Sequence, residues 1–460
     1  MEKYDAIIIG SGQGGMPLAR ALAQAGWKTA MVEEKHVGGT CINEGCTPTK
    51  TMVASAEVAY LARRAKNYGV RVGGVSVNLQ EIHQRKEDIV TSFRDGDESR
   101  LIKDGVRLIW GRASFIGPKI IEVKPKEGGD LLQMTAETIV INAGGRSRPI
   151  KLDGLQGIPF LDSTSILDLV ELPDHLMIIG GSYVALEFGQ MFLRFGSQVT
   201  VIQRSAYLLG REDADVAEAV LEIVREDGIK VLLNAETQRV ERDTAGKIHL
   251  KVTTPAGEQD LVGSHLLLAA GRIPNSDWLN LPAAGIETDS QGYIRTNDRL
   301  ETNVPGVYAI GDIKGGPAFT HISYDDFRIL KTNLLEKGHA SIRGRMIPYT
   351  MFIDPQLGRI GMIEIDARQQ FPNLQVAKIP MTYIARALET DQSRGFIKAL
   401  VDMDTKQIVG AAVLGADGGE IMAMLQIAMM GKLPYTALRD ATFAHPTFSE
   451  GLNTLFSNLP

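Results

Sequence analysis

Two stretches of this chain decide its fold: DAIIIGSGQGGMPLARALAQAGWKTAMVEE at residues 5–34 and HLMIIGGSYVALEFGQMFLRFGSQVTVIQR at residues 175–204. Each contains a short apolar run, a glycine turn, a segment of helical composition, a second glycine and another apolar run. This succession is typical of a strand, a crossover helix and a parallel strand. Because it occurs twice with the same spacing between its glycines, the sequence predicts an α/β fold with two parallel sheets.

The glycines of the first copy fit the pattern G-x-G-x-x-G, at Gly10, Gly12 and Gly15. The first allows a tight turn, the second lets the backbone approach a pyrophosphate, and the third lets the helix pack closely on the strand. Glu33 ends the second strand, where a carboxylate accepts hydrogen bonds from ribose hydroxyls. Together these features predict a Rossmann-like dinucleotide site, although the glycines alone would also fit a structural turn.

The second copy has a looser version of this pattern. Its three positions are held by small residues, Gly180, Ser182 and Ala185. At the position of Glu33 it has Gln203, followed by Arg204 and further on by Arg211. A carboxylate would repel the 2′-phosphate of NADPH, whereas guanidinium groups bind it. The sequence therefore favours NADPH over NADH at this site, with ordinary surface arginines as the alternative.

Two dinucleotide sites in one chain indicate a flavin and a nicotinamide nucleotide that exchange electrons. We therefore expect FAD at the first site and NADPH at the second. The segment GVYAIGD at residues 306–312 supports the flavin, because its apolar strand ends in Asp312, whose carboxylate would accept a hydrogen bond from the ribityl chain. Taken alone, Asp312 would also fit a helix cap.

The only cysteines, Cys41 and Cys46, lie in the segment GGTCINEGCTPTK at residues 38–50. A disulfide closing so short a loop would stabilise the fold by only about 2 kcal/mol, so a redox role is favoured over a structural one. Lys50 follows Cys46 by one helical turn if this segment is helical. Its ammonium and the helix N-terminus would lower the pKa of the thiol, although Lys50 would also fit a solvated helix face.

The segment AHPTFSEGLNTLF at residues 444–456 offers proton chemistry through His445 and Glu450. An imidazole suits the protonation of a thiolate that leaves a disulfide, and a carboxylate on its other nitrogen would orient the ring. The alternative is structural, because Thr447 and Glu450 also have the spacing of a capping box that opens the last helix.

The composition excludes several classes of protein. Of the 460 residues 44% are apolar and 23% are charged, as in ordinary globular enzymes, and a net charge of −6 gives no electrostatic case for binding nucleic acid or an anionic membrane. No run reaches the roughly 18 apolar residues of a membrane span, and the first residues lack the basic flank of a signal peptide. We expect a cytoplasmic enzyme with no structural metal site.

Motifs along the whole chain resemble, in content and order, those of the class I flavoprotein disulfide reductases, the pyridine nucleotide-disulfide oxidoreductases. They are GSGQGG with Glu33, GGTCINEGCTPTK, GGSYVALEFG, AAGRIPN, GVYAIGD and HPTFSE. The resemblance implies an FAD-binding domain with the redox disulfide at residues 1–148 and a NAD(P)-binding domain at 149–275. It further implies a central domain completing the FAD site at 276–344 and an α+β dimerisation domain at 345–460.

The resemblance also implies roles for single residues. Cys41 would be the thiol that meets the substrate, and Cys46 the thiolate against the flavin. Lys50 would pair with Glu187 beside the flavin ring, and Tyr183 would cover the nicotinamide pocket until the nucleotide arrives. Four further residues would flank the cofactors: Thr40, Ala113, Gly145 and Gly271.

In this family the acid–base pair, here His445 and Glu450, reaches the disulfide of the partner subunit. The resemblance therefore implies a homodimer with an active site shared between subunits. It leaves the electron acceptor open among three hypotheses. These are a thiophilic metal ion or oxidant-defence acceptor, a small disulfide as in glutathione reductase or dihydrolipoyl dehydrogenase, and a redox sensor without turnover.

The segments ARALETDQSRGFIKALV at residues 385–401 and FTHISYDDFRI at residues 319–329 resemble mercuric reductases and the related reactive-chlorine-resistance reductases, a group associated with copper(II) reduction. His445 and Met362 occupy positions where mercuric reductases have tyrosine, and we expect neither the N-terminal metal-binding domain nor the C-terminal cysteine pair of those enzymes. These departures favour the reactive-chlorine-resistance group. Reduced Cys41 and Cys46 would be soft, transient ligands for Cu(I) or Hg(II).

Overall fold

The computed structural model describes residues 1–460, and its first sheet contains the N-terminal strand. The strands of this sheet are β1 (Glu2–Ile9), β2 (Thr29–Glu33), β3 (Arg107–Gly117), β4 (Ile120–Pro125), β5 (Leu132–Ile141) and β15 (Val307–Ala309). β1 pairs in parallel with β2 and β5, and β15 adds a parallel strand beside β5. A segment from late in the chain therefore completes the first sheet; that residues 276–344 also complete an FAD site stays a prediction.

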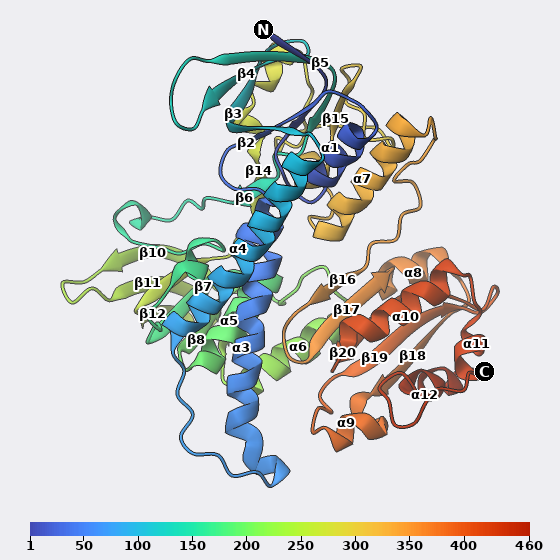
Figure 1. Cartoon of the computed structure of the whole chain (residues 1–460). Coiled ribbons are helices and arrows are strands. Elements are labelled where there is room, and N and C mark those ends of the chain that lie inside the picture. The colour runs from blue at the N-terminus through green and yellow to red at the C-terminus, as the bar shows by residue number, and fades with distance from the viewer.

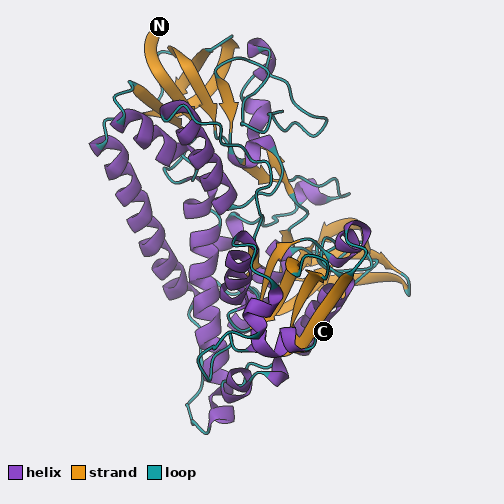
Figure 2. Ribbon diagram, turned by 90° about the vertical axis from the view of Figure 1, so that its right-hand side faces the viewer, coloured by secondary structure: helices purple, strands orange, loops and turns teal.

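Helices cover this first sheet and extend beyond it. They are α1 (Gly15–Gln24), α2 (Gly39–Asn43), α3 (Cys46–Arg64), α4 (Leu79–Lys103) and α7 (Thr320–Leu335), with the short turns η1 (Ala65–Tyr68) and η6 (Gly311–Lys314). The long helices α3 and α4 lie side by side and reach from the first sheet toward the second (Figures 1 and 2). α3 begins at Cys46, so the expected helix after the cysteine segment is present and starts at a cysteine.

The second sheet consists of four parallel strands in the order β13-β7-β8-β9. They are β7 (His175–Ile179), β8 (Gln198–Ile202), β9 (Lys230–Leu232) and β13 (His265–Leu268). α5 (Tyr183–Phe195) and α6 (Ala214–Glu226) accompany them, and β10 (Glu236–Arg242), β11 (Ile248–Thr254) and β12 (Gly257–Gly263) form a separate antiparallel sheet. Beside the first sheet, β6 (Gly145–Ser147) pairs with β14 (Arg272–Pro274), so the chain enters and leaves the second sheet through one short ribbon.

The C-terminal part is a five-stranded antiparallel sheet in the order β16-β17-β20-β19-β18. Its strands are β16 (Tyr349–Met351), β17 (Gln356–Gly361), β18 (Leu374–Pro380), β19 (Phe396–Asp402) and β20 (Gln407–Gly415). Its helices are α8 (Glu364–Gln370), α9 (Ala385–Glu389), α10 (Gly418–Met430), α11 (Tyr435–Arg439) and α12 (Gly451–Ser457). α10 packs on β17 and β20, and this part lies apart from the first sheet in Figure 1.

The expected fold class is confirmed: two α/β sheets precede an α+β C-terminal part. The second sheet is entirely parallel, whereas the first is mixed, because β4 pairs antiparallel with β3 and β5. The parallel strands β1 and β7 are apolar on both faces, as expected when helices or other strands cover them; Ile7, Ile8, Met177 and Ile178 are fully buried. The boundaries at residues 148, 275 and 344 stay predictions. None of the helices combines the length and the apolar character that a membrane crossing requires.

Candidate active site

A single cleft of about 2490 Å³ connects the two glycine turns, the cysteine segment and the edge of the C-terminal sheet. Gly10, Gly12 and Glu33 line one part of it, and Gly180 and Ser182 line another. Among the remaining expected residues, the cleft is lined by Thr40, Cys41, Cys46, Lys50, Ala113, Gly145, Tyr183, Glu187, Arg204, Arg211, Gly271 and Asp312. The structure thus brings most of the candidate site residues together around one space.

Asn142, which the sequence did not single out, shapes the first glycine turn. Its side-chain carbonyl accepts a hydrogen bond from the backbone of Gly15 at 2.9 Å, and its amide donates to the carbonyl of Ile310 at 3.0 Å. A side chain at Gly10, where φ is +96°, would collide with the backbone carbonyl of Asn142. A side chain at Gly12 would collide with the side-chain amide of Asn142. Gly15 lies behind the turn, consistent with its expected packing role.

Glu33 lies next to this turn, as expected for a ribose ligand. Its carboxylate accepts hydrogen bonds from the backbone of Ser11 at 3.0 Å and from the Ser11 hydroxyl at 2.6 Å. The backbone of Lys35 donates to the other oxygen at 2.8 Å. Each carboxylate oxygen can accept more than one hydrogen bond, so this geometry orients Glu33 toward the cleft and leaves acceptor capacity for a ligand.

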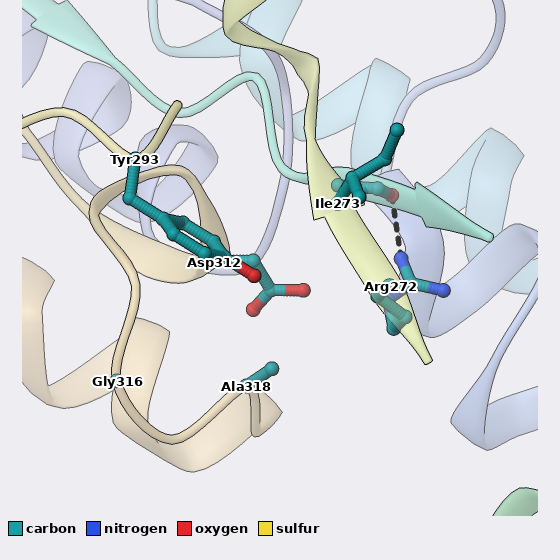
Figure 3. A pocket seen from close by; sticks show the side chains of 7 residues that line it. Arg272, Ile273, Tyr293, Asp312, Gly316 and Ala318 are labelled. Atoms are coloured by element: carbon teal, nitrogen blue, oxygen red, sulfur yellow. Dashed lines mark hydrogen bonds between the residues drawn. The ribbon is translucent and has the colours of Figure 1, made fainter. Parts of the chain in front are cut away.

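The Asp312 carboxylate points into a small cavity between Tyr293 and Arg272, shown in Figure 3. Desolvation raises the pKa of this carboxyl above its ordinary value, with the charge of Arg272 opposing the shift. The alternative role as a helix cap is wrong, because Ile310 occupies the N-cap of η6. Behind Asp312, the backbone of Gly311 donates to the fully buried Asp326 at 2.9 Å, which fixes the end of the strand.

The two thiols lie close together, with Cys41 in α2 and Cys46 at the first position of α3, and both are free. The pKa of Cys46 falls to about 6, first because Cys41 donates a hydrogen bond to it, and then because of the Thr320 hydroxyl and the Lys50 ammonium. The same hydrogen bond and desolvation raise the pKa of Cys41. The pair is therefore organised to hold a thiolate on Cys46 and a proton on Cys41.

Thr320 is a site residue that reasoning from the sequence missed. Its hydroxyl oxygen lies 3.2 Å from the sulfur of Cys46, although 274 positions separate the two residues. It is the first residue of α7 and follows Phe319. The motif FTHIS signalled the segment, but no local pattern indicated which cysteine it would meet.

The predicted pair of Lys50 and Glu187 is present. The Lys50 ammonium lies 2.6 Å from one oxygen of Glu187, whose side chain is 5% exposed. The other oxygen accepts a hydrogen bond from the backbone of Phe352 at 2.8 Å, and the ammonium lies 4.9 Å from the centre of the Phe352 ring. The ion pair thus joins α3 and α5 to the residue that follows β16, close to the cysteines.

Tyr183 begins α5 and remains 37% exposed at the cleft. Its ring centroid lies 6.4 Å from that of Phe319, and Phe319 stacks on Tyr349 at 5.5 Å and on His321 at 5.4 Å. This aromatic stack of Phe319, His321 and Tyr349 comes from two distant segments and was not expected from the sequence. It forms a wall next to the residue expected to cover the nicotinamide pocket.

At the second glycine turn, Gln203 is directed into its own loop. Its amide donates to the hydroxyl of Ser205 at 2.6 Å and to the carbonyl of Tyr207 at 3.1 Å. Arg204 and Arg211 are exposed and line the cleft. The second copy therefore has no carboxylate at the position that corresponds to Glu33 in the first copy. Ala185 is fully buried in α5 and has a packing role.

His445 and Glu450 form the expected contact, with 2.8 Å between the imidazole Nδ1 and the carboxylate. Of the alternative capping box, the structure contains one hydrogen bond, in which the backbone of Glu450 donates to the Thr447 hydroxyl at 3.3 Å. Thr447 does not cap the last helix, because α12 begins only at Gly451. The His445 side chain is 70% exposed, and neither His445 nor Glu450 lines the cleft of its own chain. The pair is thus free to meet a second molecule.

Comparison with known proteins agrees with this geometry. The model of the pyridine nucleotide-disulphide oxidoreductase family matches residues 4–326, and the dimerisation domain of that family matches residues 347–456. The chain is 37% identical over 462 residues to RclA of Escherichia coli (strain K12), described as a probable pyridine nucleotide-disulfide oxidoreductase, with 99% of both chains covered.

Two further relatives have other described activities. A mercuric reductase of Bacillus cereus is 32% identical, with 98% of this chain and 70% of the relative covered. A dihydrolipoyl dehydrogenase of Chlamydia muridarum is 31% identical, with 98% and 95% covered. The solved copper(II) complex of the HOCl-induced flavoprotein disulfide reductase RclA from Escherichia coli superposes with a TM-score of 0.91 at 36% identity, covering 100% of both chains. The chain belongs to the pyridine nucleotide-disulphide oxidoreductase family.

Proposed function

We propose that this enzyme uses NADPH and FAD to reduce a Cys41–Cys46 disulfide, and that the reduced pair passes electrons to a thiophilic metal ion such as Cu(II) or Hg(II), or to another acceptor of oxidant defence. Family membership implies FAD and a pyridine nucleotide; the acceptor and the preference for NADPH are the finer parts of the proposal. The observation that carries it is the environment of Cys46, which lowers the pKa of its thiol to about 6 inside the cleft shared by both glycine turns.

The residues of the first site fit FAD. The glycine turn leaves no room for side chains at Gly10 and Gly12, Glu33 keeps acceptor capacity for ribose, and the Asp312 carboxylate points into its own cavity. When bound, FAD supplies two-electron transfer between a nicotinamide and a disulfide. The cleft continues from these residues to Lys50.

The chain's own residues manage the proton and the sulfur charge. Two electrons and one proton break the sulfur–sulfur bond and leave a thiolate on Cys46 and a thiol on Cys41. The Thr320 hydroxyl and the Lys50 ammonium stabilise the thiolate, and Glu187 holds the ammonium in place. Cys41 keeps the proton because its pKa is raised.

A soft metal ion suits the reduced pair, because two sulfur ligands favour Cu(I) and Hg(II) over hard cations. Two relatives point the same way: RclA was solved as a Cu(II) complex, and mercuric reductases match nearly the whole chain. Reduction of two Cu(II) ions to Cu(I) would consume the two electrons of the dithiol and regenerate the disulfide, with release of the Cys41 proton.

The preference for NADPH rests on Arg204 and Arg211, which are exposed at the cleft beside a turn without a carboxylate.

The dimerisation domain indicates a homodimer. In that dimer, His445 and Glu450 would serve the cysteines of the partner subunit. We further propose a cytoplasmic location, because a redox-active dithiol needs a reducing compartment to recycle.

A disulfide substrate is the second candidate, and the His445–Glu450 contact favours it. The Glu450 carboxylate, 2.8 Å from Nδ1 of His445, would orient the ring so that its other nitrogen could pass a proton to a leaving thiolate. Reduction of a metal ion needs no such proton. The dihydrolipoyl dehydrogenase among the relatives is named for a dithiol substrate, whose oxidised form is a disulfide.

The test is a steady-state screen of the purified FAD-loaded enzyme with NADPH and four acceptors: Cu(II), Hg(II), glutathione disulfide and lipoamide. The proposal expects turnover with a metal ion and loss of that turnover in Cys41→Ser and Cys46→Ser. Turnover with a disulfide alone would support the second candidate. Stoichiometric reduction without turnover by any acceptor would contradict both and favour a redox sensor.

A further inference from the structure

The loop between β8 and α6, residues 203–213, carries both arginines and closes over the second glycine turn. The backbone of Leu209 donates to the carbonyl of Gly181 at 2.9 Å, and the backbone of Glu212 donates to the carbonyl of Leu209 at 2.8 Å. A side chain at Gly181 would collide with Leu208 from this loop. The position of Arg211 is therefore set by the packing of the loop on the turn.

The far end of this loop is tied to the C-terminal sheet by a buried ionic cluster. Asp213 accepts hydrogen bonds from the guanidinium of Arg359 at 2.8 Å and from the backbone of Glu364 at 2.6 Å. Lys398 lies 3.4 Å from Asp213 and 2.7 Å from Glu364. Asp213, Arg359 and Lys398 are nearly fully buried, so the end of the loop is fixed to the C-terminal part of the chain.

Glu212 reaches from the same loop into the cleft. One oxygen accepts a hydrogen bond from the hydroxyl of Tyr349. The other lies 3.7 Å from Arg359, is buried and has no hydrogen-bond partner. With a side chain only 4% exposed, Glu212 is held between Arg359 and Tyr349 and has no freedom to turn toward solvent.

Tyr349 carries this contact to the cysteines. Its ring stacks on Phe319 with an interplanar angle of 11°, and Phe319 lies next to Tyr183, which borders the proposed nicotinamide pocket. The residue after Phe319 is Thr320, whose hydroxyl contacts Cys46. A continuous series of contacts therefore leads from Glu212, the residue after Arg211, to the aromatic stack beside Tyr183 and to the thiol of Cys46.

We propose that Glu212 and Tyr349 are positioning residues that fix the position of loop 203–213, with its two arginines, relative to the aromatic stack. A dinucleotide bound by its 2′-phosphate would then place its nicotinamide beside Tyr183. This inference rests on the proposed use of NADPH. A nucleotide without the 2′-phosphate lacks the group that the arginines would bind, so the position of the loop matters less for it. The link thus sets cofactor selectivity through the position of the loop that carries the arginines.

The test compares kcat/KM of the FAD-loaded enzyme for NADPH and for NADH in steady state, with the same saturating electron acceptor for both nucleotides. Tyr349→Phe removes the hydroxyl and keeps the stacking ring, and Glu212→Gln keeps an acceptor for that hydroxyl. We expect Tyr349→Phe to lower kcat/KM for NADPH on the order of tenfold, the effect of leaving the buried Glu212 carboxyl without its hydrogen-bond donor. The value for NADH should change much less, and Glu212→Gln should resemble the wild type.

Two controls separate positioning from general damage. Tyr383→Phe removes a hydroxyl from an exposed tyrosine of the same C-terminal part, away from the cleft, and should change neither nucleotide. Arg211→Ala combined with Tyr349→Phe should cost no more than Arg211→Ala alone, because both changes act on one contact with the 2′-phosphate. If Tyr349→Phe lowers FAD content, Glu212→Ala gives the same comparison without changing the ring.

The outcomes distinguish this inference from the proposed function. A wild-type enzyme that does not prefer NADPH would overturn the proposed preference and this inference with it. A wild type that prefers NADPH, with Tyr349→Phe and Glu212→Ala keeping the same ratio of kcat/KM for NADPH and NADH, would overturn this inference alone. Equal loss with both nucleotides would show a purely structural role and would also overturn it.

Discussion

The hydroxyl oxygen of Thr320 lies 3.2 Å from the sulfur of Cys46, and this contact joins the first residue of α7 to the first residue of α3. It places a neutral hydrogen-bond donor on the thiol that also meets the Cys41 hydrogen bond and the Lys50 ammonium. A sulfur with three such neighbours is stabilised as a thiolate at neutral pH.

The first prediction concerns this thiolate. In the two-electron-reduced enzyme, the long-wavelength absorbance of a thiolate next to the flavin should persist at neutral pH and disappear below a midpoint near 6, the pKa of Cys46. Thr320→Val should raise that midpoint, with about a tenfold increase in proton affinity for a lost hydrogen bond to a charged group. Thr332→Val, on the same helix, is the matched control and should leave the midpoint unchanged.

A second prediction concerns the ion pair of Lys50 and Glu187. Lys50→Met should destabilise the FAD-loaded protein by about 3 kcal/mol in chemical denaturation, because it leaves the buried Glu187 carboxylate without its cation. Replacing both residues, with Lys50→Met and Glu187→Leu, should recover part of the loss because no uncompensated charge remains. A single Lys50→Met variant as stable as the wild type would show that the pair contributes little.

The third prediction tests the nucleotide preference. Replacing Arg204 and Arg211 by alanine should raise KM for NADPH on the order of tenfold or more and leave KM for NADH nearly unchanged, because only NADPH carries the phosphate that the guanidiniums bind. The difference should shrink in high salt, since the arginines are exposed. Equal losses for the two nucleotides would remove the argument from the 2′-phosphate.

The fourth prediction follows from the burial of Glu212, which raises the pKa of its carboxyl from 4.5 to about 7. Between these values the folded protein holds a proton that the unfolded chain releases, so the free energy of unfolding should fall as pH rises, by roughly 3 kcal/mol in total. Glu212→Gln should abolish this slope. Glu226→Gln, at the exposed end of α6, should keep it; a slope shared by both variants would assign it to other groups.

Site residues could be predicted from the sequence where they belong to a short local motif. The glycine turn with Glu33, the helix that places Lys50 one turn after Cys46, and the contact of His445 with Glu450 were all expected from short motifs, and the structure contains them. The pairing of Lys50 with Glu187 came from the family resemblance, because residues on two distant helices share no local pattern.

The contacts that were missed all depend on tertiary packing between segments. Asn142 ties the glycine turn to Ile310, the residue after β15, and Thr320 meets Cys46 from another helix. Tyr349 stacks on Phe319 across the boundary to the C-terminal part, and its hydroxyl reaches Glu212. None of these partners is fixed by spacing along the chain, so only the folded structure identifies them.

The most direct test of the central claim is a thiol count on the FAD-containing protein before and after anaerobic reduction by NADPH, with alkylation under denaturing conditions. Because the chain has two cysteines, the account predicts no free thiols in the oxidised enzyme and two after reduction. An enzyme with the same number of thiols in both states, or one that binds no FAD, would contradict the proposed electron transfer through Cys41 and Cys46.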